Sequence, residues 1–353
     1  MGSLVKSNGD SEVINVSTLW KKSRLLVTDS FSEPPVVIKI EDSIVGTLGN
    51  FSASTGKAKS KKTFNVSAIV ASALINDQVL GYCSSFSGSK RNILYIDTEQ
   101  SPFHCLMVMQ RILLLAGLPL DRQPQNLEFL CLRGSDPKTR ILIIEHIIEN
   151  FENLGLVIID GIRDLVYDIN SPSESTYLIT KLMQWTDEKQ IHIHVVLHLN
   201  KGDDNTRGHL GTELNNKAET VLQITKNEFD KNISSVTAMH IRDKDFEPFA
   251  FRINANGLPE LIEDYEHQKT GSSKGFDYAE VSEEKHREAL EFLFSVSPLV
   301  SYSSLIEKLQ TSYATVGHLF GINKAKKLKT FLENKRMILK EDRFYRFNPD
   351  FYY

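Results

Sequence analysis

The chain contains, at residues 49–63, the stretch Gly49-Asn-Phe-Ser-Ala-Ser-Thr-Gly56-Lys-Ala-Lys-Ser-Lys61-Lys62-Thr63, after a short β-type run and before a helical pattern. Phosphate-binding loops place a glycine, four residues and Gly-Lys-Ser/Thr between a strand and a helix. Gly56, Lys62 and Thr63 match this pattern, and Lys61 replaces its second glycine. Such a loop turns backbone N–H groups toward phosphate. We therefore predict a nucleotide site, with a basic surface loop as the alternative; its candidate residues are Gly56, Lys57, Ala58, Lys59, Ser60, Lys61, Lys62, Thr63 and Phe64.

Two carboxylates, Glu99 and Asp160, each follow an apolar β-type run. In a parallel sheet the carboxyl ends of the strands line the ligand crevice. Glu99 is therefore a candidate general base that deprotonates an attacking water. Asp160 and the hydroxyl of Thr63 are candidate ligands of Mg²⁺. Asp97, just before a helix start, is interpreted as a helix cap.

A further strand is predicted at residues 191–199, with His192, His194 and His198 on one face. His198 and Asn200 end this strand, and we expect them to sense the γ-phosphate beside the loop. Three histidines on one face also suggest zinc, but no cysteine or further ligand cluster accompanies them.

The polar, Gly-rich segment at residues 203–214 follows this strand, and we predict a mobile loop that contacts DNA. Lys201 and Arg207 are its candidate contacts. The strand predicted at residues 236–242 ends in Arg242. We expect this cation to reach the nucleotide of a neighbouring subunit as an arginine finger, with a surface salt bridge as the alternative.

β-type runs and helical periodicity alternate from about residue 35 to residue 262. This alternation predicts an α/β fold, a mostly parallel sheet with helices on both faces. The last three strands follow one another closely and are expected to form an antiparallel extension. The β-type runs are 36–40, 93–96, 127–132, 156–159, 191–199, 220–224, 235–241 and 249–253, and the helical segments are 62–75, 102–116, 138–152 and 173–189.

The C-terminal part of the chain has a different pattern. Helices are predicted near residues 283–294, 302–310 and 315–334, the last with a break at Gly321, before a strand-turn-strand at residues 337–347. This order predicts a winged helix that binds DNA phosphates, with docking on a protein or on the rest of the chain as the alternative. Its candidate DNA contacts are Lys324, Lys327, Lys335, Arg343 and Arg346. The predicted domains are an N-terminal extension (1–34), an ATPase domain (35–262), a linker (263–281) and the winged-helix domain (282–353).

The composition is typical of a folded globular chain, with 41% hydrophobic and 24% charged among 353 residues. No apolar run reaches the roughly 18 residues of a membrane-spanning helix, and no signal peptide is present, so we expect no membrane partner. Three widely spaced cysteines exclude a disulfide framework and favour the cytoplasm. The net charge of −4 combines +5 over residues 301–353 with −9 before them. This asymmetry is typical of a tail that meets a polyanion, although a solvated helix face has the same signature.

This ordered set of motifs resembles the RecA-like core of hexameric replicative helicases of the DnaB and plasmid RepA type. The loop is more similar still to that of short ATPases carried by mobilizable elements and plasmids of Bacteroides-type bacteria, whose form Gly-Asn-Phe-Ser…Gly-Lys-Ala-Lys-Ser-x-Lys-Thr-Phe is present here. The resemblance covers roughly residues 35–255, and His240-x-Arg242 stands where the helicases commonly carry Lys-x-Arg. The matching positions are Gly56, Lys62-Thr63, Glu99, Asp160, His198-x-Asn200, Arg207-Gly208…Gly211-Thr212-Glu213 and Arg242.

The resemblance implies a P-loop ATPase that uses ATP and Mg²⁺, binds single- or double-stranded DNA and forms a homo-oligomer, with a hexamer as one arrangement. In that family the lysine and threonine corresponding to Lys62 and Thr63 bind nucleotide and Mg²⁺. The same correspondence gives Glu99 the activation of water, Asp160 the binding of Mg²⁺ and Arg242 the action across the subunit interface.

Three functions are compatible with these patterns. The first, which we favour, is an ATP-driven, ring-forming and helicase-like motor in the replication or mobilization of a mobile element. The second is an ATP-switched DNA-binding regulator or replication initiator with slow hydrolysis, which Lys61 and the lack of an N-terminal collar domain favour. The third is a small-molecule kinase, against which the Gly-rich segment and the basic C-terminal domain argue.

Overall fold

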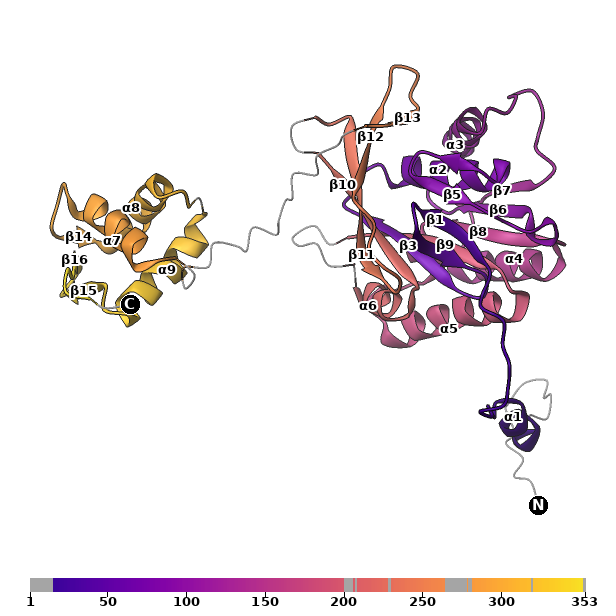
Figure 1. Ribbon diagram of the computed structural model, residues 1–353, viewed down its shortest axis with the longest axis horizontal. Coiled ribbons are helices and arrows are strands. Elements are labelled where there is room, and N and C mark those ends of the chain that lie inside the picture. Colours follow the sequence, from indigo (N-terminus) through magenta and orange to yellow (C-terminus); the bar gives the residue numbers. More distant parts are fainter. Residues whose placement is uncertain are drawn as a thin grey trace. The chain divides into compact units, whose positions relative to one another are not determined.

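The computed structural model describes residues 15–199, 206, 208–227, 230–263, 278, 281–318 and 320–351 (Figure 1). The chain divides into two compact units, with the boundary after residue 265. Of the predicted linker, residues 264–277 and 279–280 lie outside the described residues, as do residues 1–14 of the predicted N-terminal extension.

A nine-stranded sheet forms the centre of the first unit. Its strand order is β13-β12-β11-β10-β3-β9-β8-β6-β7. Neighbours from β10 to β7 run parallel, whereas β11, β12 and β13 pair antiparallel. The strands are β3 (Phe51–Gly56), β6 (Asn92–Asp97), β7 (Leu127–Cys131), β8 (Leu154–Asp160), β9 (His192–His198), β10 (Thr220–Lys226), β11 (Ile233–Ile241), β12 (Phe249–Ile253) and β13 (Pro259–Leu261).

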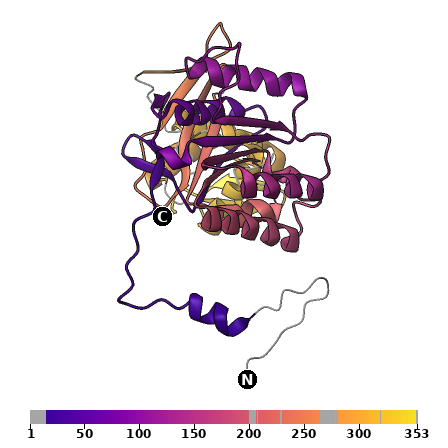
Figure 2. The same ribbon diagram turned by 90° about the vertical axis from the view of Figure 1, so that its right-hand side faces the viewer.

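Helices cover both faces of this sheet and bury two separate apolar cores (Figures 1 and 2). One core takes its helical residues from α2 (Lys62–Ile75) and α3 (Pro102–Leu115). The other takes them from α4 (Pro137–Asn150), α5 (Pro172–Lys189) and α6 (Gly208–Lys217), with the 3-10 turn η2 (Ile162–Leu165). The predicted α/β class, a mostly parallel sheet with helices on both faces, is thereby confirmed.

A smaller sheet packs against the first of these cores, in the order β2-β1-β5-β4. The predicted extended segment at residues 36–40 is its strand β1 (Val36–Ile40). The other strands are β2 (Ser43–Thr47), β4 (Gln78–Val79) and β5 (Tyr82–Ser84). The first unit also contains α1 (Val16–Lys22) and the 3-10 turn η1 (Gly88–Lys90).

Three predictions for the first unit were wrong in part. Residues 51–56, treated above as part of the phosphate loop, form the central strand β3. The last three predicted strands are not wholly antiparallel, because β10 pairs in parallel with β3. The predicted loop at residues 203–214 is helical from Gly208, because Leu210 and Leu214 lie one turn apart and are both buried.

The second unit packs three helices and a three-stranded antiparallel sheet around its own apolar core. Its elements follow in the order α7 (Glu283–Phe294), β14 (Val300–Ser301), α8 (Tyr302–Thr315), α9 (Ile322–Asn334), β15 (Ile338–Glu341) and β16 (Phe344–Phe347), with sheet order β14-β16-β15. The helix predicted at residues 315–334 starts too early. Gly317 adopts a φ of 87°, a left-handed conformation that ends α8, and α9 begins only after Gly321.

None of the helices in the described part of the chain is both long and apolar enough to cross a membrane.

Candidate active site

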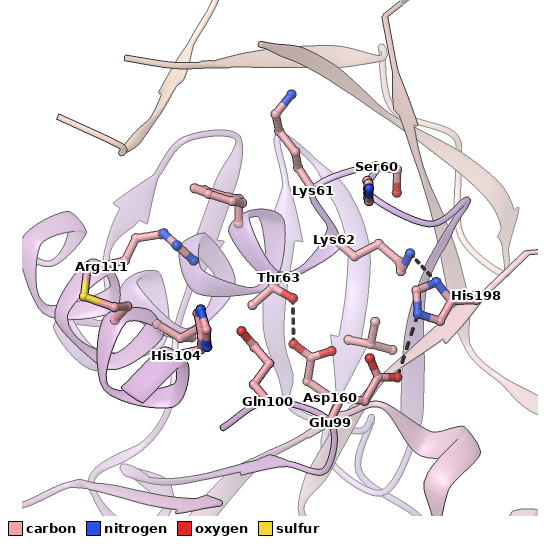
Figure 3. A pocket seen from close by; sticks show the side chains of 15 residues that line it. Ser60, Lys61, Lys62, Thr63, Glu99, Gln100, His104, Arg111, Asp160 and His198 are labelled. Atoms are coloured by element: carbon pink, nitrogen blue, oxygen red, sulfur yellow. Dashed lines mark hydrogen bonds and ion pairs between the residues drawn. The ribbon is translucent and has the colours of Figure 1, made fainter. Parts of the chain in front are cut away.

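The strand register brings the predicted polar side chains to one edge of the large sheet. Gly56 of β3 lies opposite His198 of β9, and Asp160 of β8 lies opposite Asp97 of β6. A cavity of about 260 Å³ opens at this edge, beside the N-terminus of α2 (Figure 3). It is lined by residues 59–64, Glu99, Gln100, His104, Met107, Val108, Arg111, Asp160, Val196 and His198.

The phosphate loop begins at Gly56, where a Cβ atom would lie 2.4 Å from the carbonyl oxygen of Ile224. A side chain at this position would therefore displace the backbone. Lys61 adopts a φ of 68°, the left-handed region in which glycine is favoured. This conformation explains the glycine of the general pattern, and lysine there costs about 1 kcal/mol. Gly56, Lys57 and Ala58 of the predicted set do not line the cavity.

Lys62 is the central cation of the site. Its Nζ donates to the carbonyl oxygens of Gly56 (2.7 Å) and Lys57 (3.0 Å). It also donates to Nδ1 of His198 at 3.0 Å. Burial lowers the pKa of Lys62 to about 8, although the carboxylates of Asp160 and Glu99 raise it. The ammonium is thus held by neutral oxygen and nitrogen atoms that a phosphate group could replace.

His198 connects this cation with the predicted base. Because an ammonium only donates, Nδ1 of His198 accepts from Lys62, and the proton of the neutral ring is assigned to Nε2. Nε2 lies 3.8 Å from Oε1 of Glu99 (Figure 3). The His198 ring lowers the pKa of the Glu99 carboxyl below its usual range. Glu99 therefore stays ionised near neutral pH and is able to accept a proton.

Thr63 and Asp160 form the candidate cation site. Thr63 Oγ1 donates to Oδ2 of Asp160 at 2.9 Å, and the hydroxyl of Tyr95 donates to the same oxygen at 3.0 Å. Burial, and to a lesser extent the carboxylate of Asp97, raises the pKa of Asp160 to about 6. A buried carboxylate beside a hydroxyl fits Mg²⁺, which binds to few protein oxygens and keeps water and phosphate ligands. The described residues include no group of three or more His, Cys, Asp and Glu side chains that could enclose a metal ion.

Asp97 fixes the turn that carries Glu99. Its Oδ1 accepts the backbone N–H groups of Glu99 (3.0 Å) and Gln100 (2.7 Å), and its Oδ2 accepts from the side-chain amide of Gln100. The interpretation of Asp97 as a helix cap was wrong, because Ser101 is the N-cap residue of α3 and Asp97 caps the turn that precedes it. Asp97 therefore orients the predicted base from outside the cavity.

The other two histidines of β9 form a closed polar cluster. Ser52 Oγ lies 2.7 Å from Nε2 of His192 and 2.8 Å from Nδ1 of His194. Ser54 Oγ lies 2.8 Å from Nε2 of His194, and Nδ1 of His192 lies 2.9 Å from the carbonyl oxygen of Thr47. Burial lowers the pKa of His192 to about 4 and that of His194 to about 3, so both rings are neutral. Their nitrogens are occupied by hydroxyls and a carbonyl rather than gathered for zinc.

The remaining candidates of the first unit lie elsewhere. Asn200, Lys201 and Arg207 are outside the described residues. Arg242 follows β11 at the amino-terminal edge of β3, opposite the cavity. It is exposed, donates to the carbonyl oxygen of Lys217 at 3.1 Å and borders a second cavity of about 860 Å³. Within one copy, Arg242 is therefore not part of the first cavity.

The predicted DNA contacts of the second unit differ in their surroundings. Helix α9 buries the face that carries Ala325, Leu328 and Leu332. Three of the candidates are exposed: Lys327, Lys335 and Arg343. The other two are partly buried: the ammonium of Lys324 lies 5.5 Å from the ring centroid of Tyr278, and the guanidinium of Arg346 pairs with Glu341 across the hairpin.

Four polar residues at or beneath the cavity were not predicted: Tyr95, Gln100, His104 and Arg111. Arg111 carries the clearest signal in the sequence, because it is the only Asp, Glu, Lys or Arg residue in the mostly apolar helix α3. A charged residue in such a helix points to a cavity or a buried partner. Tyr95 and Gln100 carry no such signal, since they belong to a strand and a turn of ordinary composition.

Comparisons with known proteins extend this description. A family model described as AAA domain matches residues 22–204, more than half of the chain. A search of curated proteins finds no match. Similar solved structures include the RadB recombinase, with 17% identity over 61% of this chain and 92% of that chain and a TM-score of 0.44. A KaiC-like protein from the hyperthermophilic archaeon Pyrococcus horikoshii OT3 has 12% identity over 62% and 91%, with a TM-score of 0.45. By its match to the family model over residues 22–204, the chain belongs to the AAA domain family.

Proposed function

We propose that this chain is an ATP-hydrolysing motor that acts on DNA as a ring of copies, in the replication or mobilization of a mobile element. The observation that carries the proposal is the gathering of Lys62, Thr63, Glu99, Asp160 and His198 around one cavity. Bound ATP would supply the phosphoanhydride bond that is cleaved, and Mg²⁺ would offset charge on its phosphates. The form of the phosphate loop alone supports the link to mobile elements.

Each side chain of the cavity would have a distinct task. Lys62 would exchange its two carbonyl contacts for phosphate oxygens. Thr63 and Asp160 would hold the cation. Glu99, which stays ionised, would orient a water and accept its proton. His198 contacts Lys62 and faces Glu99, so the loss of the terminal phosphate would be transmitted to β9 and to the segment that follows it.

The DNA-binding part of the proposal depends on the second unit as a winged helix. Its order of helices and strands and the exposed Lys327, Lys335 and Arg343 support this assignment. Truncation after Glu263 would lower DNA affinity and reduce its dependence on salt, because fewer phosphate contacts remain. Unchanged affinity would remove this unit from the DNA interface.

The ring is supported by the position of Arg242, which is exposed at the sheet edge opposite its own nucleotide site. An arginine finger at that edge can reach a nucleotide only in the site of a second, neighbouring copy. Lys62→Ala and Arg242→Ala would each be inactive alone. Mixing them would restore hydrolysis, because an intact Lys62 of one copy then meets an intact Arg242 of the next. A mixture that stays inactive contradicts the assignment.

Steady-state ATP hydrolysis with and without single-stranded DNA tests the motor directly, with Lys62→Ala as the blank. Strong stimulation by DNA, followed by strand displacement on a forked duplex, is the expected result. Hydrolysis no faster than the blank under every condition would contradict the ATPase proposal itself.

A second candidate, the ATP-switched DNA-binding regulator or initiator, is favoured by one observation. Part of the segment predicted as a mobile DNA loop is the packed helix α6, whose Leu210 and Leu214 are fully buried. Slow, DNA-independent hydrolysis together with tight ATP binding would support this switch over the motor.

A further inference from the structure

Arg111 is a charged side chain at the cavity for which the phosphate-loop and strand-end motifs provide no role. It comes from α3 and lines the cavity. Its Nε is buried without a hydrogen-bond partner, and no residue in the described part of the chain forms a hydrogen bond or ion pair with its guanidinium. The guanidinium carbon lies 3.7 Å from the ring centroid of Phe64, the residue after Thr63. Arg111 is therefore held in position by stacking and by packing alone.

Arg111 is partly buried, and a cation without a counter-charge is costly to the protein to the extent that it is removed from water. Burial lowers the pKa of Arg111, yet a guanidinium remains charged at neutral pH. Buried charges are normally paired, since desolvation without a counter-charge is unfavourable. The stack on Phe64 offsets part of this cost. An anion that enters the cavity would offset the rest.

The position of Arg111 relative to the loop indicates which anion this is. Lys62 and His198 lie on one side of Thr63, and His104 and Arg111 lie on the other (Figure 3). In phosphate loops the lysine reaches the β- and γ-phosphates, and the hydroxyl contacts Mg²⁺. The side of Thr63 away from Lys62 is thus left for the part of the nucleotide nearest its sugar.

We propose that Arg111 binds the α-phosphate of the nucleotide and that Phe64 holds its guanidinium in place. This inference rests on the proposed function, since it concerns the same cavity. It assigns Arg111 a contact that ATP and ADP share, so Arg111 would contribute to affinity without sensing the phosphate that is cleaved. The contact would be equal for adenine and guanine nucleotides, because the α-phosphate does not depend on the base.

Equilibrium binding to the full-length chain tests this assignment, with ADP, GDP and the non-hydrolysable analogue AMPPNP as probes. Arg111→Met removes the charge at similar volume, and Arg122→Met, an exposed arginine beyond α3, is the matched control. We expect Arg111→Met to lower the affinity for all three nucleotides by the same factor, roughly 10- to 100-fold. Arg122→Met should leave each affinity unchanged. The melting temperature of the nucleotide-free protein should stay the same or rise in Arg111→Met, because an uncompensated cation is lost.

Other outcomes would overturn the proposal in identifiable ways. A loss confined to AMPPNP would place Arg111 at the γ-phosphate, and a changed ratio of ADP to GDP affinity would place it at the base. Equal affinity of wild type and Arg111→Met would remove it from the site. If Arg111→Met lowers the stability of the protein, the Arg111→Lys variant provides the test. Arg111→Lys keeps the positive charge, so it must retain most of the nucleotide affinity if that charge binds the phosphate. Failure of the wild type to bind any nucleotide would contradict the proposed function instead.

Discussion

The two halves of strands β3 and β9 carry similar polar side chains and use them in opposite ways. Toward their amino ends, Ser52, Ser54, His192 and His194 bond to one another inside the core. Toward the carboxyl end of β9, His198 lies at the cavity and is only partly enclosed. The amino-terminal half is closed and satisfied, whereas the cavity at the other end also holds the charged groups of Lys62, Glu99 and Asp160, which come from neighbouring elements.

This difference distinguishes polar residues that stabilise the fold from polar residues that bind a ligand. Buried polar groups that find partners within the protein specify one packing of the core. Charges that are partly removed from water at a cavity, such as those of Lys62, Asp160 and Arg111, have a desolvation cost that a bound ligand can offset. We therefore expect substitutions in the open half to impair activity and substitutions in the closed half to impair stability.

Lys62→Ala is expected to have the largest effect. The loss of the central cation should reduce hydrolysis by roughly 1000-fold or more, since phosphate charge in a low-dielectric site is no longer offset. Thermal melting should change little, because the variant also removes a poorly solvated charge. Lys138→Ala, an exposed lysine of α4, is the control for both assays. Near-normal hydrolysis by Lys62→Ala would place the reaction elsewhere.

Glu99→Gln is expected to bind nucleotide yet hydrolyse it roughly 100- to 1000-fold more slowly, because the amide cannot accept the proton of water. Single-turnover hydrolysis and nucleotide affinity measure the two effects separately. Glu128→Gln, an exposed residue of β7, should behave as the wild type. Turnover of Glu99→Gln at the wild-type rate would show that another group is the base.

The closed half should make the protein sensitive to acid. The folded pKa values of His192 and His194, about 4 and about 3, lie below the value near 6.5 of an exposed histidine. The unfolded chain therefore takes up protons first, and the stability present above pH 6.5 is lost as the pH falls. The free energy of unfolding should decrease by about 3 kcal/mol per ring between pH 7 and pH 4.

Urea unfolding at the two pH values measures this loss. His194→Gln should depend less on pH than the wild type, whereas His146→Gln, at an exposed position of α4, should not differ from it. An equal pH dependence of wild type and His194→Gln would mean that the buried rings do not control acid stability.

Ser52→Ala tests the closed half at constant pH. It leaves a nitrogen of each histidine without its hydroxyl partner, at an expected cost of about 1–3 kcal/mol in the free energy of unfolding. Nucleotide affinity should be retained, since Ser52 does not line the cavity. A loss of affinity without a loss of stability would abolish the distinction between the two halves.

Lys61→Gly should have the smallest effect. Glycine relieves the left-handed conformation at Lys61, which favours the variant by about 1 kcal/mol, but it also loosens the unfolded chain and removes a contact with the Lys231 carbonyl. We expect a net change in the free energy of unfolding below about 1 kcal/mol. Nucleotide affinity within a few-fold of the wild type would show that the lysine does not impair the loop.

Local patterns in the amino-acid sequence were sufficient for much of the fold. Helical periodicity marked α2, α3, α4 and α5 within one or two residues, and apolar runs marked β6, β8 and β9. The candidate lysine and hydroxyl follow from the phosphate-loop pattern, and the two carboxylates follow from residue types at strand ends, which parallel strands bring to a single edge. These features depend on residues close together in the chain, and so a linear pattern contains them.

Strand β3 and Arg111 were decided only by the tertiary structure. Phe51–Gly56 contains only two apolar residues. Its serines can be buried in a central strand because histidines of β9 form hydrogen bonds with them. Arg111 lies at the site only because α3 packs against α2, which places its guanidinium over the ring of Phe64. In both cases the free energy comes from partners far apart in the sequence, and no local pattern records which residues will meet.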